Sequence, residues 1–206
     1  MDVQELIRLQ LELECKNLNE AGDIVPIPCP NPDDIPRILV IKHKDGYNVF
    51  FRYDLPSPLR ASLTTVSPRV LFTDQPRVKS LLSQYNPCNE IWLGKSYVFP
   101  PELGLSSHLE VIHLPEQSSC AIIIDGENVS TCSSARENHA AGEAWTFTQP
   151  EYRRRGYGKL VTAAWGQRLR EKGKVPFYSH LGDNAASEGI ARSLGLIQFI
   201  SAVGYV

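Results

Sequence analysis

The feature of this 206-residue chain that most constrains its fold is a pair of glycines, Gly156 and Gly158, between an apolar run and a helical pattern. Residues 144–148 predict a strand, and apolar residues recur at helical spacing from Leu160 to Leu169. Glycine allows successive backbone N–H groups to point toward one ligand, and a helix N-terminus adds partial positive charge. The pattern therefore predicts a strand–loop–helix turn that binds a phosphate or pyrophosphate.

The spacing of these glycines excludes two other phosphate-binding motifs. A dinucleotide fingerprint requires G-x-G-x-x-G, but the glycine after Gly158 is Gly166, inside the helical pattern. A P-loop requires G-x-x-x-x-G-K-[ST], which is absent although Lys159 follows Gly158. The pattern that remains is R-x-x-G-x-G, formed by Arg153, Gly156 and Gly158.

A second pattern follows the loop. Residues 175–179 predict a short buried strand, and Gly173 stands where the preceding helix should end. Asn184 then opens another helical pattern, which Gly195 closes before a further apolar run at residues 196–200.

Together the two patterns resemble the acyl-CoA-binding half of the GNAT superfamily of N-acyltransferases. The first resembles P-x-[YF]-[RQ]-x-x-G-x-[GA], which begins here at Pro150. The second resembles N-x-x-[AS]-x-x-[LIV]-[YA]-x-x-L-G-[FL], matched by Asn184, Ser187, Ile190, Ala191, Leu194, Gly195 and Leu196. The resemblance covers residues 120–200, and Ser134-Ala135-Arg136 is similar to a segment of an uncharacterised bacterial-type subgroup.

This resemblance implies an α/β (α+β) fold with a mixed, mostly antiparallel sheet flanked by helices. Acetyl-CoA would be the acyl donor, its pyrophosphate held by loop N–H groups and its thioester oxygen by a backbone N–H near residues 147–149. Asn184 is also a favoured helix N-cap, so a purely structural role stays open for it. The cofactor-binding residues that the resemblance implies are Phe147, Thr148, Arg153, Arg155, Gly156, Tyr157, Gly158, Lys159, Asn184 and Ser187.

Acyl transfer to an amine requires a base, because an alkyl ammonium loses its proton only near pH 10 (roughly). The predicted base is Glu143, seven residues before Pro150, since many GNAT proteins carry an acidic residue on this strand. A solvent-facing strand glutamate is the structural alternative. Glu137 and His139 are substitutes because both lie just upstream.

The general acid is not assigned. The tyrosine that often protonates the departing CoA thiolate in the family is replaced here by Ala191. Tyr178, Tyr205 or a water could take its place, or the thiolate could leave unprotonated, since a cysteine-like thiol has a pKa of about 8.5. His180 and Cys132 are predicted to be structural, as a strand-end histidine and a buried thiol.

Composition bounds the class of protein. With 42% hydrophobic residues the chain can bury a sizeable core, and no apolar run approaches the roughly 20 residues of a membrane span. The acidic N-terminal segment predicts a cytoplasmic protein with no membrane partner.

Five cysteines without a C-x-x-C pair predict free thiols and no metal site. Residues 151–174 carry a net positive charge while the rest of the chain is acidic, and the pI is near 6.2, which favours a phosphorylated cofactor over nucleic acid.

Two domains are predicted, with the boundary where Phe99-Pro100-Pro101-Glu102-Leu103-Gly104 interrupts a strand pattern. Residues 1–104 would form an N-terminal α/β module on the acceptor side, and residues 105–206 the GNAT catalytic domain. The N-terminal part predicts helices over residues 3–18 and 78–85, a hairpin turning at Lys44-Asp45-Gly46, and a strand over residues 90–98. The second part begins with a meander of strands over residues 120–124, 129–133 and 141–148, with a turn at Asp125-Gly126.

The predicted function is N-acetyl transfer from acetyl-CoA to a primary amine by direct attack in a ternary complex. A non-catalytic acyl-CoA-binding regulatory protein is the alternative, which the alanine at position 191 keeps open. The acceptor stays open, acetyl is a default, and the protein could be a monomer or a homodimer.

Overall fold

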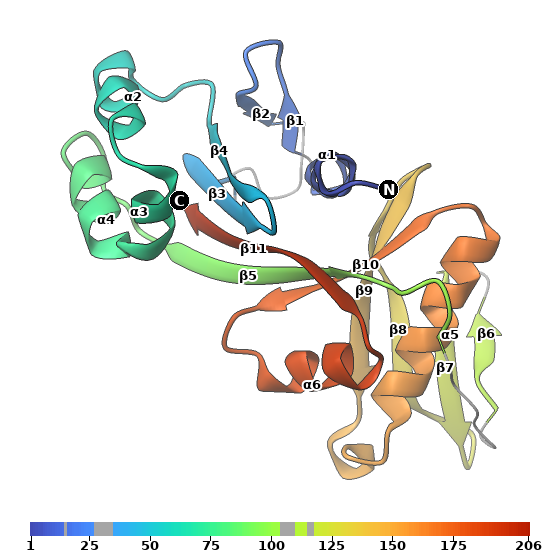
Figure 1. Ribbon diagram of the computed structural model, residues 1–206. Coiled ribbons are helices and arrows are strands. Elements are labelled where there is room, and N and C mark those ends of the chain that lie inside the picture. Colours follow the sequence, from blue (N-terminus) through green and yellow to red (C-terminus); the bar gives the residue numbers. More distant parts are fainter. Residues whose placement is uncertain (15, 27–34, 104–109, 115–117) are drawn as a thin grey trace. The chain divides into compact units, whose positions relative to one another are not determined.

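The computed structural model of the protein describes residues 1–14, 16–26, 35–103, 110–114 and 118–206 (Figure 1). They form two compact units. Unit 1 consists of residues 1–95 and 199–206, and unit 2 consists of residues 96–198. The sequence predicts a boundary at residue 104, whereas these units divide after Lys95 and the last eight residues return to unit 1.

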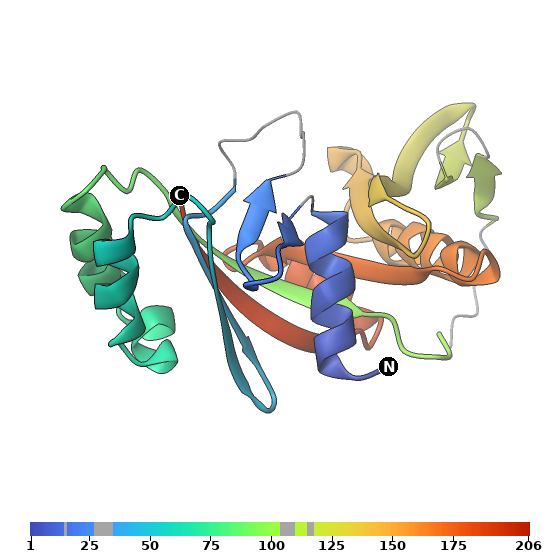
Figure 2. The same cartoon turned by 90° about the horizontal axis from the view of Figure 1, so that it is seen from above.

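Unit 1 contains an antiparallel ladder in which β4 (Gly46–Phe51) pairs with β3 (Ile38–His43), and β3 pairs with the end of β11 (Ile197–Tyr205). The predicted hairpin is confirmed, since His43 pairs with Gly46 across a two-residue turn. The first residues of β5 (Ile91–Val98) also belong to this unit. Three short helices pack around a core of aliphatic side chains: α2 (Ser57–Thr64), α3 (Pro68–Thr73) and α4 (Gln75–Ser83), seen together in Figure 2.

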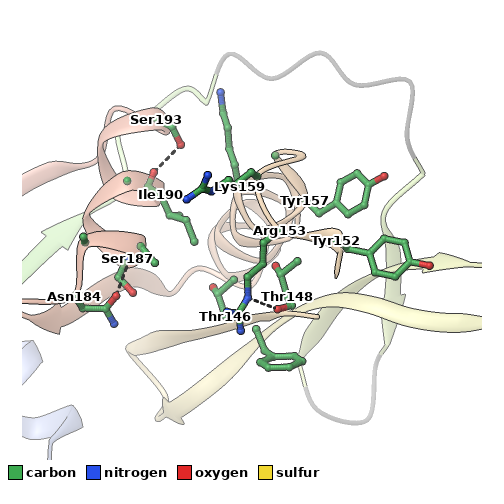
Figure 3. Close-up of a pocket in the computed structure, with 17 residues that line it drawn as sticks. Thr146, Thr148, Tyr152, Arg153, Tyr157, Lys159, Asn184, Ser187, Ile190 and Ser193 are labelled. Atoms are coloured by element: carbon green, nitrogen blue, oxygen red, sulfur yellow. Dashed lines mark hydrogen bonds between the residues drawn. The ribbon is translucent and has the colours of Figure 1, made fainter. Parts of the chain in front are cut away.

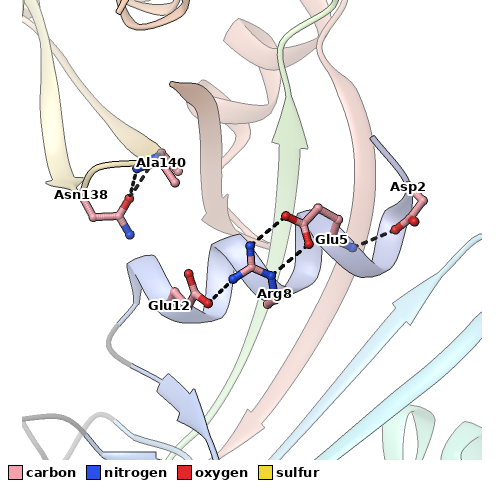
Figure 4. Close-up of polar contacts among 7 residues, drawn as sticks. Asp2, Glu5, Arg8, Glu12, Asn138 and Ala140 are labelled. Carbon is pink, nitrogen blue, oxygen red and sulfur yellow. Dashed lines mark hydrogen bonds and ion pairs between the residues drawn. The ribbon is translucent and has the colours of Figure 1, made fainter. Parts of the chain in front are cut away.

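The first helix, α1 (Val3–Leu13), is shorter than predicted. Asp2 caps it by accepting a hydrogen bond from the Glu5 N–H at 2.9 Å, and Arg8 pairs with Glu5 and Glu12 along one side (Figure 4). Beyond the helix, β1 (Lys16–Leu18) pairs with β2 (Ile24–Pro26) around a turn in which the Asn19 side chain accepts two backbone N–H groups. This local turn competes with the helix and ends it early.

The sheet of unit 2 is mixed and mostly antiparallel. Its meander runs through β6 (Ile112–Leu114), β7 (Ser119–Ile124), β8 (Glu127–Glu137) and β9 (Ala141–Thr148), and β10 (Val175–Leu181) then pairs with β9 in parallel. Asp125 and Gly126 both have positive φ, the conformation that a tight Asp-Gly hairpin turn requires. The turn between β8 and β9 is held by Asn138, whose Oδ1 accepts the N–H groups of Ala140 and Ala141 (Figure 4).

Helix α5 (Tyr157–Glu171) connects β9 to the parallel strand β10 and packs against β7, β8, β9 and β10. Its buried face carries Val161, Trp165 and Leu169, at the helical spacing read from the sequence. Helix α6 (Ala185–Ser193) follows β10 and contributes to the same core. A mostly antiparallel α/β sheet flanked by helices is thus the fold class that the sequence predicts.

Three buried cysteines, Cys88, Cys120 and Cys132, are free thiols as predicted. The prediction for Cys15 and Cys29 falls outside the described residues. No helix in the described part of the chain is long and apolar enough to cross a membrane.

Candidate functional site

A pocket of about 800 Å³ lies within unit 2, a size typical of sites for small molecules (Figure 3). Three segments form its walls: the end of β9, the loop that enters α5, and the first two turns of α6. The residues that line it are Thr146, Phe147, Thr148, Tyr152, Arg153, Arg154, Gly156, Tyr157, Gly158, Lys159, Asn184, Ala185, Ala186, Ser187, Gly189, Ile190 and Ser193.

The pocket opens where β9 and β10 separate. Their parallel register covers only residues 141–143 of β9 and 175–177 of β10. Beyond the last pair, Phe177 with Glu143, β9 continues to Thr148 and β10 to Leu181. The β9 residues that line the pocket pair with β8 on one side and are beyond the pairing with β10 on the other, so a backbone edge is available there to a ligand.

The loop before α5 presents backbone N–H groups to the pocket. Gly156 caps the helix at φ 83° and offers no side-chain acceptor to the first turn. The N–H groups of Tyr157, Gly158 and Lys159 therefore have no intrahelical partner by helix geometry. Arg154 also has positive φ (62°), so two residues close together adopt the left-handed conformation found in anion-binding nests. The turn predicted from the glycines is present and has the geometry of an anion site.

The three arginines of the loop play different parts. Arg153 donates its Nε–H to the Thr148 carbonyl at 3.1 Å, which ties the loop to the end of β9. Arg155 lies over the Tyr152 ring at 5.2 Å and does not line the pocket. Arg154 does line it, although the sequence does not distinguish this residue from a solvated arginine, because its positive φ is visible only in the structure.

The structure brings together every predicted cofactor-binding residue except Arg155. It adds hydroxyl groups at Thr146 and Ser193, which the sequence patterns do not single out, and at Tyr152, which belongs to the first pattern but is not among the predicted binding residues. The lining contains Arg153, Arg154 and Lys159 and no carboxylate. Fixed N–H groups, cations and hydroxyls in one pocket suit a polyanionic ligand with a polar chain.

Asn184 has the structural role that the sequence leaves open. Its Oδ1 accepts the N–H of Ser187 at 3.0 Å, so it caps α6 while also lining the pocket. Its amide nitrogen is the group that could bind a ligand in addition.

We expect Asn184→Ala to lower the free energy of unfolding by about 1 kcal/mol, because the cap is lost. Asn184→Asp keeps the acceptor oxygen and should keep most of that stability, measured by urea unfolding. If the amide nitrogen contacts acetyl-CoA, the aspartate variant will lose affinity despite its stability. An alanine variant as stable as wild type contradicts the capping role.

The predicted base, Glu143, is 4% exposed and lies outside the pocket lining. Its carboxylate pairs with the Arg136 guanidinium at 2.6 Å and accepts the Ser179 hydroxyl. Side chains alternate along a strand, so Glu143 lies on the opposite face of β9 from Thr146, which bonds the Thr162 hydroxyl of α5 at 2.8 Å.

Its two predicted substitutes also lie outside the pocket lining. Glu137 pairs with Lys174 at 2.6 Å and accepts the Ser134 hydroxyl at 2.6 Å. Burial works against ionisation, but the hydrogen bonds from Lys174 and Ser134 outweigh it and hold the pKa of Glu137 below its ordinary value. His139 is exposed in the turn between β8 and β9.

Because its pKa is lower in the folded state, Glu137 stabilises the fold above its ordinary pKa of 4.5 and loses this contribution as the pH falls through the folded value. We expect Glu137→Gln to be less stable than wild type at pH 7 and to converge with it in acid, as followed by thermal unfolding between pH 7 and pH 3. Glu127→Gln, an exposed change on the same strand, is the control. A constant difference between Glu137→Gln and wild type over this range contradicts the assignment.

Within the described ranges no group of three or more histidine, cysteine or acidic side chains is placed to hold a metal ion.

Comparisons with known proteins agree on one fold. Residues 141–202 match the family model of the FR47-like protein. An acetyltransferase from the GNAT family of Colwellia psychrerythraea is similar over 100% of this chain and 98% of its own, at 9% identity and a TM-score of 0.53. A functionally unknown conserved protein from Staphylococcus epidermidis is similar over 91% of both chains, at 11% identity and a TM-score of 0.50.

A third structure, a GNAT-family chain from Novosphingobium aromaticivorans, is similar over 57% of this chain and 66% of its own, at 15% identity and a TM-score of 0.45. No curated protein has a sequence significantly similar to this chain.

Proposed function

We propose that this chain, a member of the GNAT superfamily by its fold and its FR47-like segment, is an acyl-CoA-dependent N-acetyltransferase acting on a primary amine. The observation that carries the proposal is the pocket itself. It joins an N–H cradle at the start of α5, three cations and the open edge of β9 in one site. These are the groups that a pyrophosphate followed by an amide-containing arm requires.

In this proposal different residues of the pocket bind different parts of acetyl-CoA. The N–H groups of residues 157–159, with Arg154 and Lys159, hold the pyrophosphate. The unpaired edge of β9 at residues 146–148 hydrogen-bonds the pantetheine arm as a neighbouring strand would. A backbone N–H on the same edge polarises the thioester carbonyl, and Asn184 and Ser187 approach the arm from α6.

Glu143 is proposed as the group that receives the proton of the amine. Two features support it. Glu143 belongs to the last residue pair before β9 and β10 separate. Its carboxylate accepts a hydrogen bond from Ser179, which lies two residues beyond that pair on β10. The Arg136 guanidinium pairs with the same carboxylate and fixes its position.

We expect Glu143→Gln to lower kcat by roughly 100-fold while the affinity for acetyl-CoA stays within about threefold of wild type, because the residue acts on the acceptor amine. Measurement is by mass spectrometry of the acetylated product. Glu137→Gln, whose carboxylate pairs with Lys174, is the matched control and should keep the wild-type rate. A Glu143 variant with wild-type kcat between pH 6 and 9 contradicts the base assignment.

The test of the function is product formation in a panel of primary amines that contains alkylamines, amino acids, aminoglycosides and peptides with free N-termini or lysines. An acetylated amine that requires both protein and acetyl-CoA supports the proposal. Tight binding of acetyl-CoA with no acetylated product across the panel would favour a binding protein instead.

A further inference from the structure

A cluster of titratable side chains lies in unit 2 next to the pocket but outside its lining. At its centre is His180, near the end of β10, with a side chain 1% exposed. The Tyr97 ring of β5 stacks on the His180 ring with centroids 5.5 Å apart, and Tyr178 meets its edge at 6.4 Å. Glu188 of α6 completes the cluster, with Oε2 3.3 Å from His180 Nε2. Among the described residues, Tyr97, Tyr178 and Glu188 are the titratable groups seen in contact with the imidazole.

The surroundings of His180 require one proton more than a neutral imidazole and an ionised carboxylate carry together. Its Nδ1 lies 2.7 Å from the Leu181 carbonyl oxygen, which can only accept, so Nδ1 carries a hydrogen. In a neutral ring Nε2 would then be a bare acceptor. This nitrogen is inaccessible to solvent, makes no hydrogen bond within the described residues, and faces the Glu188 carboxylate. Two acceptors in contact without a proton would be costly, and one proton on Nε2 or Oε2 turns the contact into an attraction.

Tyr97 fixes the carboxylate in this contact. Its hydroxyl donates to the same Glu188 oxygen at 3.1 Å. Burial, followed by the hydrogen bond to Glu188, raises the pKa of Tyr97 to about 12, so the phenol remains a donor at neutral pH. Tyr97 is thus a positioning residue for the Glu188 carboxyl group.

Glu188 is flanked in the sequence by residues that line the pocket. His180 lies on β10 beyond its last pairing with β9. Glu188 stands between Ser187 and Gly189, which both line the pocket, and its side chain is 41% exposed. A proton held here can therefore exchange with solvent through Glu188, whereas His180 itself is enclosed.

We propose that the His180–Glu188 pair shares a bound proton and gives it to the thiolate of departing CoA, in place of the tyrosine that this chain lacks at Ala191. The role rests on the proposed acetyltransferase function. When the C–S bond of the tetrahedral intermediate breaks, sulfur takes the bonding electron pair and the proton moves from the Glu188 carboxyl group to sulfur. The pair then regains a proton from solvent, and no other reactant is needed.

The shared proton is tested first, without any assumption about activity, by ¹⁵N NMR of histidine-labelled protein at pH 7. The His180 Nε2 resonance should differ from that of an unprotonated imidazole nitrogen, and the difference should disappear in Glu188→Ala. An unprotonated Nε2 that is the same in wild type and variant would overturn the proposal.

The acid role is tested with acetyl-CoA and hydroxylamine, a small nucleophile that is largely unprotonated at neutral pH, by following acetohydroxamate. In wild type we expect the rate to fall at high pH. Glu188→Gln and His180→Asn should lower kcat by about 100-fold, keep acetyl-CoA affinity, and lose this fall. Tyr97→Phe should give a smaller loss, and Glu171→Gln, an exposed change on α5, none.

A purely structural role would instead lower stability and acetyl-CoA affinity together and leave the shape of the pH profile unchanged, which would overturn the acid role. A wild-type protein that binds acetyl-CoA but makes no acetohydroxamate would also overturn it. A wild type that does not bind acetyl-CoA refutes the proposed function, and the NMR result still decides whether the proton is shared.

Discussion

Replacing Gly158 with leucine should abolish acetyl-CoA binding in a protein that remains folded. A Cβ atom at this position would lie 3.3 Å from both Ile190 Cδ1 and Thr148 Oγ1, and 3.6 Å from Thr146 Cγ2. All three neighbours line the pocket, so a longer side chain extends into the space between α5, α6 and β9. We expect affinity to fall at least 100-fold, which corresponds to about 2.7 kcal/mol.

The measurement is the shift in melting temperature that acetyl-CoA causes. A ligand at about 100 times its Kd stabilises the folded state by about 2.7 kcal/mol, so wild type should melt several degrees higher in its presence. Gly158→Ala adds only a crowded methyl group and serves as the graded control, with a reduced but measurable shift. A leucine variant that melts cooperatively and still shows the wild-type shift would mean that acetyl-CoA binds elsewhere.

Gly166→Ala should cost about 2 kcal/mol of stability, although alanine is normally the better helix former by about 1 kcal/mol. A Cβ atom here would lie 2.3 Å from Phe99 Cε1 and 2.5 Å from Cδ1. Phe99 is buried and packs on Trp165 with ring centroids 5.9 Å apart, so its ring cannot move aside freely. The expected cost is that of overpacking a dense core.

A matched control exists in α6. Gly189 is also a helical glycine, and a Cβ atom there would have no neighbour within 4 Å. Gly189→Ala should therefore be neutral or stabilising by up to about 1 kcal/mol. Urea unfolding of both variants measures the difference, and a Gly166 variant at least as stable as wild type would show that α5 does not approach Phe99 as described.

The parts of the fold that the sequence predicts well are those with local signals. The glycine turn before α5 and the Asp-Gly turn between β7 and β8 follow from backbone conformations that few residues adopt. The resemblance to the GNAT superfamily, read from two motifs, agrees with the FR47-like match over residues 141–202 and with the fold. Helices α2 and α3 were not predicted, because eight and six residues are too few to show a helical period.

The candidate site also has features that the sequence predicts and features that it does not. Part of the pocket lining, such as Gly156, Gly158 and Asn184, could be predicted because these residues belong to two short motifs whose spacing carries the backbone geometry. The surroundings of the predicted base could not, since the contact of Glu143 with Arg136 depends on a register shift in β8 between Ser134 and Arg136. The pairing of His180 with Glu188 joins a strand to a helix and has no sequence signature. The catalytic role of Glu143 stays a prediction.

The measurement that tests the account most directly is calorimetric titration of the purified wild-type protein with acetyl-CoA and with free CoA. We predict binding of one acetyl-CoA per chain in the micromolar range, lost in Gly158→Leu. A folded protein that shows no heat of binding with acetyl-CoA or with free CoA at millimolar concentration would contradict the assignment of the pocket and with it the acetyltransferase function.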